Sequence, residues 1–220
     1  MLPDSKTPVW TPNKTEKLRK RFFQLRNMWE SHIVTDPLKL RGRRRIAEHG
    51  TPDWLASMNT VPVEWITGFR MTYRTDVARK ERFSEELGQY ALYEDVDISL
   101  RVMKEKLVVA CLDAGIYHHR YPSNRANGRA IGAMHMLNRA FVLVKSGEAT
   151  SRERWAMWRW GTARTIIEIL RARDLYGKQR RDGTIAAYLA LRTMLAAGPS
   201  DATEVYLRLR KVIFPSETEG

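Results

Sequence analysis

The sequence predicts an all-α protein, a single multi-helix domain of about seven or eight helices with an extended N-terminal arm and a short C-terminal tail. Three observations predict this class. Apolar residues recur three and four positions apart, which is the period of one helix face. Residues that cap helix N-termini precede several of these stripes, and glycine or proline separates them. Apolar residues make up 43% of the chain, which is enough for a packed core.

The N-terminus reads as an arm followed by an amphipathic helix. Residues 1–12 contain three prolines and Trp10, without helical periodicity. We expect Trp10 to dock this arm, either on its own domain or on a neighbouring copy of the chain. Asn13 then begins a helix whose apolar stripe consists of Leu18, Phe22, Leu25, Trp29 and Ile33.

Three further helices are expected before residue 116. Thr51 and Pro52 have the residue types of a helix start. Pro62 begins the next helix, whose stripe is Ile66, Phe69, Tyr73 and Val77. The acidic segment 93–97 precedes a third helix, which ends at Gly115. Its stripe is Leu100, Met103, Leu107 and Cys111, so we expect Cys111 to be buried.

The stretch from Gly128 to Tyr176 is the expected folding centre. Its first half repeats apolar residues on one helix face, at Ala130, Met134, Leu137, Phe141 and Val144. Its second half opens with Thr150 and Glu153 at the spacing of a capping box. Large aromatic and aliphatic side chains follow, at Trp155, Trp158, Trp160, Ile166, Ile167 and Leu170. Aromatic rings of this size dominate the core that they enter.

The rest of the chain is expected to form a basic turn and two helices. The turn runs from Tyr176 to Gly183, and Asp182 caps the helix after it. Ser200 caps the last helix, although apolar residues alternate at 205, 207 and 209 and leave a terminal strand as an alternative. We therefore divide the chain into an arm (1–12), an N-terminal helical part (13–115), a basic and aromatic loop (116–129), a C-terminal helical part (130–214) and a tail (215–220).

The charge of the chain points to a polyanionic partner. Lys and Arg number 38 against 25 Asp and Glu, a net charge of +13. A small domain needs a net charge of only about 2–8 units to stay soluble. We therefore expect nucleic acid, favouring single strands, as the partner. No secretory signal or apolar membrane span is visible, so we expect no membrane partner and an intracellular protein, in the cytoplasm or inside a nucleoprotein particle.

The sequence lacks the motifs that would indicate catalysis. It contains no GxxxxGK loop, no HExxH and no CxxC, and a single cysteine cannot form an intrachain disulfide. Glu94, Asp95 and Asp97 could hold Mg²⁺, but acidic residues at a helix start more often complement the helix dipole. We expect no enzymatic activity, no metal site and no cofactor.

The candidate nucleic-acid contacts come from two basic runs and the central loop. Loop 116–129 places aromatic rings beside cations. Proteins that bind single strands stack bases on such rings and use the cations to follow the phosphate backbone. The alternative is that the tyrosines pack against the protein and anchor the loop. The candidates are Lys17, Arg19, Arg21, Arg41, Arg43, Arg44, Arg45, Tyr117, His119, Arg120, Tyr121, Arg125, Arg129 and Arg164.

These features predict a structural protein that coats or packages nucleic acid largely independently of sequence, as an oligomer joined through the arm. An alternative is a sequence-specific regulator or replication factor, because residues 151–170 resemble a helix-turn-helix with its turn at Gly161. Thr162, Arg164 and Thr165 would then read base edges. A continuous core helix is the other interpretation of that segment. A second alternative function is a protein-only scaffold subunit.

Overall fold

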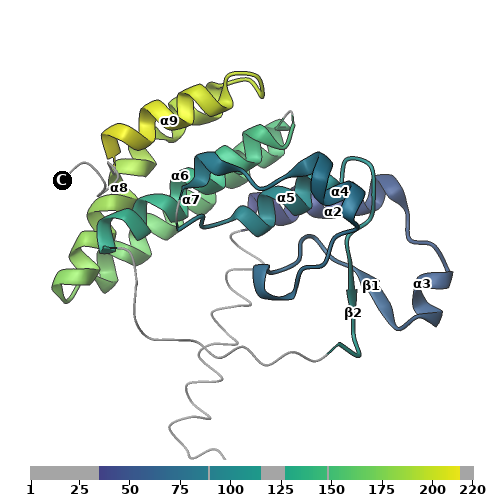
Figure 1. Cartoon of the computed structure of the whole chain (residues 1–220). Helices are drawn as coiled ribbons and strands as arrows, with labels where there is room; N and C mark the ends of the chain where they lie inside the picture. Colours follow the sequence, from purple (N-terminus) through teal and green to yellow (C-terminus); the bar gives the residue numbers. More distant parts are fainter. Residues whose placement is uncertain (1–34, 89, 115–126, 148, 214–220) are drawn as a thin grey trace, which may run out of the picture. The chain divides into compact units, whose positions relative to one another are not determined.

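Helix α6 (Gly128–Lys145) is the core of the fold, because it is apolar almost all the way round. The computed structural model describes residues 35–88, 90–114, 127–147 and 149–213 (Figure 1). Met134, Leu137, Phe141 and Val144 are buried, as the stripe predicts, and so is most of the rest of the helix. Helices α8, α9 and α2 pack against it.

The all-α prediction is confirmed by eight α-helices in the described residues. The helices besides α6 are α2 (Pro37–His49), α3 (Trp54–Ser57), α4 (Thr75–Glu81), α5 (Glu94–Val102), α7 (Ser151–Arg171), α8 (Leu175–Ala196) and α9 (Ala202–Ile213). Two short 3₁₀ turns are η1 (Gly68–Arg70) and η2 (Glu85–Leu87). The predicted arm, the helix from Asn13 and the tail from residue 215 lie outside the described residues. The chain divides into two compact units, Met1–Thr35 and Asp36–Gly220, and the second contains all of these elements.

A two-stranded ribbon replaces parts of two predicted helices. Strands β1 (Thr60–Pro62) and β2 (Val109–Cys111) are antiparallel, with Val61 opposite Ala110. Thr60 and Val61 in β1 and Val109 in β2 are β-branched residues, which favour extended backbone. The helix expected from Pro62 is therefore wrong up to Thr75, and α5 ends at Val102 rather than at Gly115. Cys111, expected to be buried, lies exposed on β2.

Glycines allow α6 and α8 to approach each other closely. A Cβ atom added to Gly132 would collide with the backbone carbonyl oxygen of Arg180, and one added to Gly183 would collide with that of Arg129. The Thr184 hydroxyl donates a hydrogen bond to the Gly132 carbonyl oxygen at 3.3 Å. The two helix backbones therefore touch where these glycines lie.

Helix α8 starts earlier than the sequence predicts. The expected turn from Tyr176 to Gly183 is helical, because the Asp174 side chain accepts a hydrogen bond from the Gly177 N–H at 2.6 Å and caps the helix at Leu175. Gly183 thus serves helix packing and does not end a turn. The alternative of a terminal strand near residue 207 is excluded, because α9 covers that segment.

Helix α7 is continuous through Gly161. Its capping box is confirmed, with Thr150 Oγ1 accepting from Glu153 N–H and Glu153 accepting from Thr150 N–H. A Cβ atom at Gly161 would lie 2.9 Å from Leu191 Cδ1, so this glycine serves contact with α8 instead of a turn. The helix-turn-helix interpretation of 151–170 is therefore wrong.

The side of α7 that faces the core also differs from the prediction. Ala156, Met157 and Gly161 are buried, whereas Trp155 is 64% exposed. Small residues on the inner face let α7 approach its neighbours closely, and this leaves no room for the indole there. Ile166 and Leu170 are likewise exposed, so the predicted apolar stripe faces outwards in part.

Candidate nucleic-acid interface

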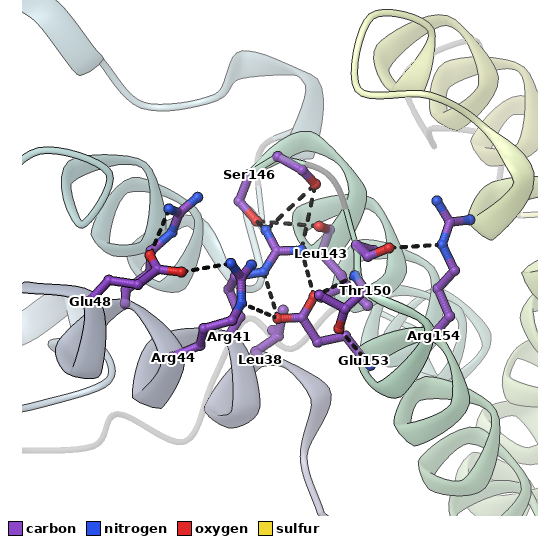
Figure 2. A network of polar contacts seen from close by, with 12 residues as sticks. Leu38, Arg41, Arg44, Glu48, Leu143, Ser146, Thr150, Glu153 and Arg154 are labelled. Carbon is purple, nitrogen blue, oxygen red and sulfur yellow. Dashed lines mark hydrogen bonds and ion pairs between the residues drawn. The ribbon is translucent and has the colours of Figure 1, made fainter.

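The basic run 39–45 forms most of helix α2, and one of its arginines points into the protein. The Asp36 side chain accepts from Leu38 N–H at 2.9 Å and Pro37 occupies the first turn, which together start the helix. Arg41, on the next turn, is fully buried. Figure 2 shows its guanidinium between Glu153 and Ser146.

Arg41 joins α2 to the N-terminus of α7. Its Nε and Nη2 atoms lie 2.9 and 3.0 Å from the two carboxylate oxygens of Glu153, and Nη1 lies 3.0 Å from Ser146 Oγ. Burial by itself would raise the pKa of Glu153, but the hydrogen bonds from Arg41 and Thr150 and the nearby positive charges hold that pKa below its usual value. The prediction that Arg41 contacts nucleic acid is therefore wrong: its donors are used inside the protein.

The other arginines of α2 stay at or near the surface. Arg44 lies between Glu48 (2.8 Å) and Glu153 (3.3 Å), and Arg45 binds Glu48 at 3.0 Å. Arg43 pairs with Glu64 at 3.1 Å, and its side chain is 64% exposed. An exposed pair of this kind is weak, so its arginine can exchange the carboxylate for a phosphate.

Arg129 and Arg164 occupy different environments from those predicted. Arg129 belongs to the first turn of α6 and not to a loop, since Asn127 caps that helix. It is exposed, and its Nε donates to the carbonyl oxygen of Ile213 at 3.4 Å. Arg164 is held by Glu168 at 2.6 Å with a side chain only 24% exposed, a position unsuited to reading base edges.

The remaining predicted contacts cannot be placed. Trp10, Lys17, Arg19, Arg21, Tyr117, His119, Arg120, Tyr121 and Arg125 all lie outside the described residues.

An exposed aromatic and basic surface on α7 was missed by the sequence analysis. Trp155 lies between Arg152 and Arg159, which are also exposed and lie three and four positions away on the same helix face. We call these three residues the α7 ridge. The sequence does contain a signal for this surface, namely the spacing of the two arginines around Trp155. The expectation that the indole is buried in the core conceals that signal.

The surface of helices α7 to α9 is predominantly basic. With the connections between them, their exposed carboxylates are Asp174, Asp182, Asp201 and Glu204. Their exposed cations are Arg152, Arg159, Arg171, Arg173, Lys178, Arg192, Arg208 and Lys211. Such an excess produces a positive local potential.

Comparison of the chain with protein-family models, curated proteins and solved structures finds no match. Within the described ranges, no group of three His, Cys, Asp or Glu side chains is placed to hold a metal ion. Glu94, Asp95 and Asp97 form the first turn of α5. None of the helices that the structure describes is both long and apolar enough to span a membrane.

A second group of arginines gathers where α6, α7 and α8 meet. Arg164 of α7 and Arg180 of α8 each place Nη2 on the same oxygen of Glu168, at 2.6 and 2.5 Å. Arg139 of α6 pairs with Asp36, and its guanidinium carbon lies 4.1 Å from the ring centroid of Trp160. We call Arg139, Arg164 and Arg180 the arginine cluster.

His135 lies beside this cluster in its neutral form. Arg139 Nη2 donates to the Tyr93 hydroxyl at 2.5 Å, and the same hydroxyl shares a hydrogen bond of 3.1 Å with His135 Nδ1. Burial, together with the charges of Arg164, Arg139 and Arg180, lowers the pKa of His135 to about 3.

Proposed function

We propose that this protein binds nucleic acid through the phosphate backbone with little readout of base sequence, and that it coats or packages the nucleic acid as an oligomer. The α7 ridge is the observation that supports this most directly. An exposed indole between two exposed arginines offers a base a stacking surface and the adjacent phosphates a cation.

The charge distribution supports the same proposal. The segment 151–213 exposes eight cations against four carboxylates, and Arg43 adds an exposed guanidinium on α2. Cations spread over several helices neutralise a backbone without reading bases. Single-stranded nucleic acid is the favoured ligand, because unpaired bases are free to stack on Trp155.

The dependence of affinity on salt tests this function. Each phosphate contact on a single strand lowers the slope of log affinity against log salt by about 0.7, so three to six contacts give a slope of about −2 to −4. The measurement is fluorescence anisotropy of labelled homopolymer oligonucleotides of equal length and different base. We expect a steep slope and similar affinities for the different bases.

A flat salt response would reject backbone binding. A strong preference for one base would instead reject the sequence-independent part of the proposal. If the purified protein carries no nucleic acid, judged by its absorbance ratio at 260 and 280 nm, and binds none of the oligonucleotides, a protein-only scaffold is the better description.

A further inference from the structure

The arginine cluster contains buried donors that have no partner in the described structure. Five buried side-chain nitrogen or oxygen atoms of the described residues lack a hydrogen-bond partner, and three of them are the Nε atoms of Arg139, Arg164 and Arg180. Arg139 is only 8% exposed. Buried donors are almost always satisfied, so three unpartnered ones show that the hydrogen bonding of this cluster is incomplete.

The charges of the cluster do not balance. Asp36 pairs with Arg139, whereas Arg164 and Arg180 share the single carboxylate of Glu168. His135 is neutral, so one positive charge is left over. The surplus lies on the partly buried pair Arg164 and Arg180, where incomplete solvation favours a counter-charge.

The cluster is also open on one side. The side chains of Arg164 and Arg180 are 24% and 29% exposed, while that of Glu168 beneath them is 5% exposed. The Nε atoms of Arg164 and Arg180 are buried, so an anion from solvent would meet the exposed remainder of these two guanidinium groups.

We propose that the arginine cluster binds one phosphate group of a nucleic-acid backbone. A phosphodiester carries a single negative charge, which matches the surplus, and the planar fork of arginine suits its oxygens. This inference rests on the proposed function and adds to it a defined phosphate contact, separate from the α7 ridge.

The first experiment uses inorganic phosphate as the probe on the full chain. The Nε–H resonances of the arginines are followed by ¹⁵N NMR during a phosphate titration in which chloride keeps the ionic strength constant. We expect saturable shifts of the Arg139, Arg164 and Arg180 signals, assigned with Arg→Lys variants. Absence of a saturable response in the wild-type chain overturns the site.

The second experiment asks whether the phosphate comes from nucleic acid. Arg180→Gln is compared with Arg192→Gln, which removes the same charge from an exposed position on α8. Loss of charge-assisted hydrogen bonds predicts that Arg180→Gln weakens binding of a single-stranded oligonucleotide about tenfold, and the control less than about threefold. If Arg180→Gln does not fold, Arg180→Lys keeps the charge without the fork and should still weaken binding more than the control.

The outcomes separate this inference from the proposed function. If Arg180→Gln and Arg192→Gln weaken oligonucleotide binding equally, nucleic acid does not supply the phosphate group that the cluster binds. A saturable response to inorganic phosphate then assigns the cluster to free phosphate. Failure of the wild-type chain to bind any oligonucleotide overturns the proposed function and this inference together. Oligonucleotide binding without an Nε–H response overturns only the inference.

Discussion

Four arginines stand within five residues of α2, and only one of them supports the fold from inside. Arg41 is fully buried against Glu153, whereas the side chain of Arg43 is 64% exposed against Glu64. All four have the same chemistry, so a sequence reading treats them as one basic run. The difference arises because the whole Arg41 guanidinium is enclosed by the turn between α6 and α7, where it binds Glu153 and Ser146, whereas Arg44 reaches Glu153 from the surface.

Replacing Arg41 tests this assignment. Arg41→Met should lower the free energy of unfolding by up to about 3–5 kcal/mol, because the buried Glu153 carboxylate loses its two-pronged partner and keeps only Arg44, at 3.3 Å, as a counter-charge. Arg43→Met removes an exposed ion pair and should cost less than about 1 kcal/mol. Urea denaturation of both variants measures the difference. Similar values for the two would contradict the structural role of Arg41.

His135 makes the stability of the protein sensitive to acid. Its pKa is about 3 in the folded state and about 6.5 when unfolded, so between these values the unfolded chain binds more protons. The contribution of neutral His135 to the free energy of unfolding is fully present above about pH 6.5 and is lost as the pH falls towards 3. The loss between pH 7 and pH 5 should be up to about 2 kcal/mol.

His135→Gln should remove this part of the pH dependence. Glutamine does not titrate, so the variant should lose less stability than the wild type between pH 7 and pH 5, whatever its stability at pH 7. Urea denaturation at half-unit pH steps measures the two profiles. Parallel profiles would show that His135 titrates normally in the folded protein.

Helix packing depends on two glycines, one of which, Gly183, the sequence analysis places at the end of a turn. Gly132 and Gly183 lie inside α6 and α8, at the points where the two backbones touch. Glycine is unfavourable in a helix interior, and an isolated one is commonly read as a break. Here the close helix contact compensates for that cost.

Alanine substitution separates packing from helix propensity. In an uncrowded helix Gly→Ala stabilises by up to about 1 kcal/mol. Gly132→Ala and Gly183→Ala should instead destabilise by about 1–3 kcal/mol or more, because the added Cβ collides with a carbonyl oxygen of the other helix. Gly198→Ala, in the connection after α8, is the control for adding a Cβ atom where there is room, since its nearest neighbour would lie at 3.7 Å. Thermal unfolding shows whether each substitution stabilises or destabilises the protein. A Gly132→Ala variant that is more stable than the wild type would contradict the close contact.

The α7 ridge predicts a binding defect without a folding defect. Trp155→Ala should weaken single-strand binding by about 1–3 kcal/mol, or roughly 5- to 150-fold, because one stacking surface is lost. Trp155 is 64% exposed, so the unfolding midpoint should hardly change. Trp54→Ala on α3, where the side chain is 59% exposed, is the matched control and should leave affinity unchanged. Equal losses in the two variants would remove α7 from the interface.

The ribbon of β1 and β2 shows why some elements could not be predicted. Val61 and Ala110 pair across the ribbon although they lie far apart in the chain. Each strand has only three residues. An alternating pattern this short cannot be distinguished from the helical spacing of the neighbouring residues. Longer helices such as α6 and α9 carry several turns of periodic signal, and both were predicted.

We expect the N-terminal arm to join neighbouring copies of the chain in the assembled complex. If Trp10 docks on a neighbouring copy, deletion of residues 1–12 should reduce the mass of the complex formed with a long single strand. Light scattering after size exclusion measures that mass. Trp155→Ala, compared at a protein concentration that saturates the strand, should retain it. An unchanged mass after deletion would contradict assembly through the arm.

The all-α class, the Thr150 capping box and the long helix α6 follow from interactions between residues a few positions apart. Such contacts form in any fold that contains the segment, and spacing and cap chemistry are therefore enough to predict them. The burial of Arg41, the outward position of Trp155 and the role of Gly183 depend on partners elsewhere. Arg41 and Glu153 are 112 positions apart, and Thr184 and Gly132 are 52 apart. Which face of a helix turns inwards is decided only when its neighbours arrive, because the free energy of burying a side chain depends on what it is packed against.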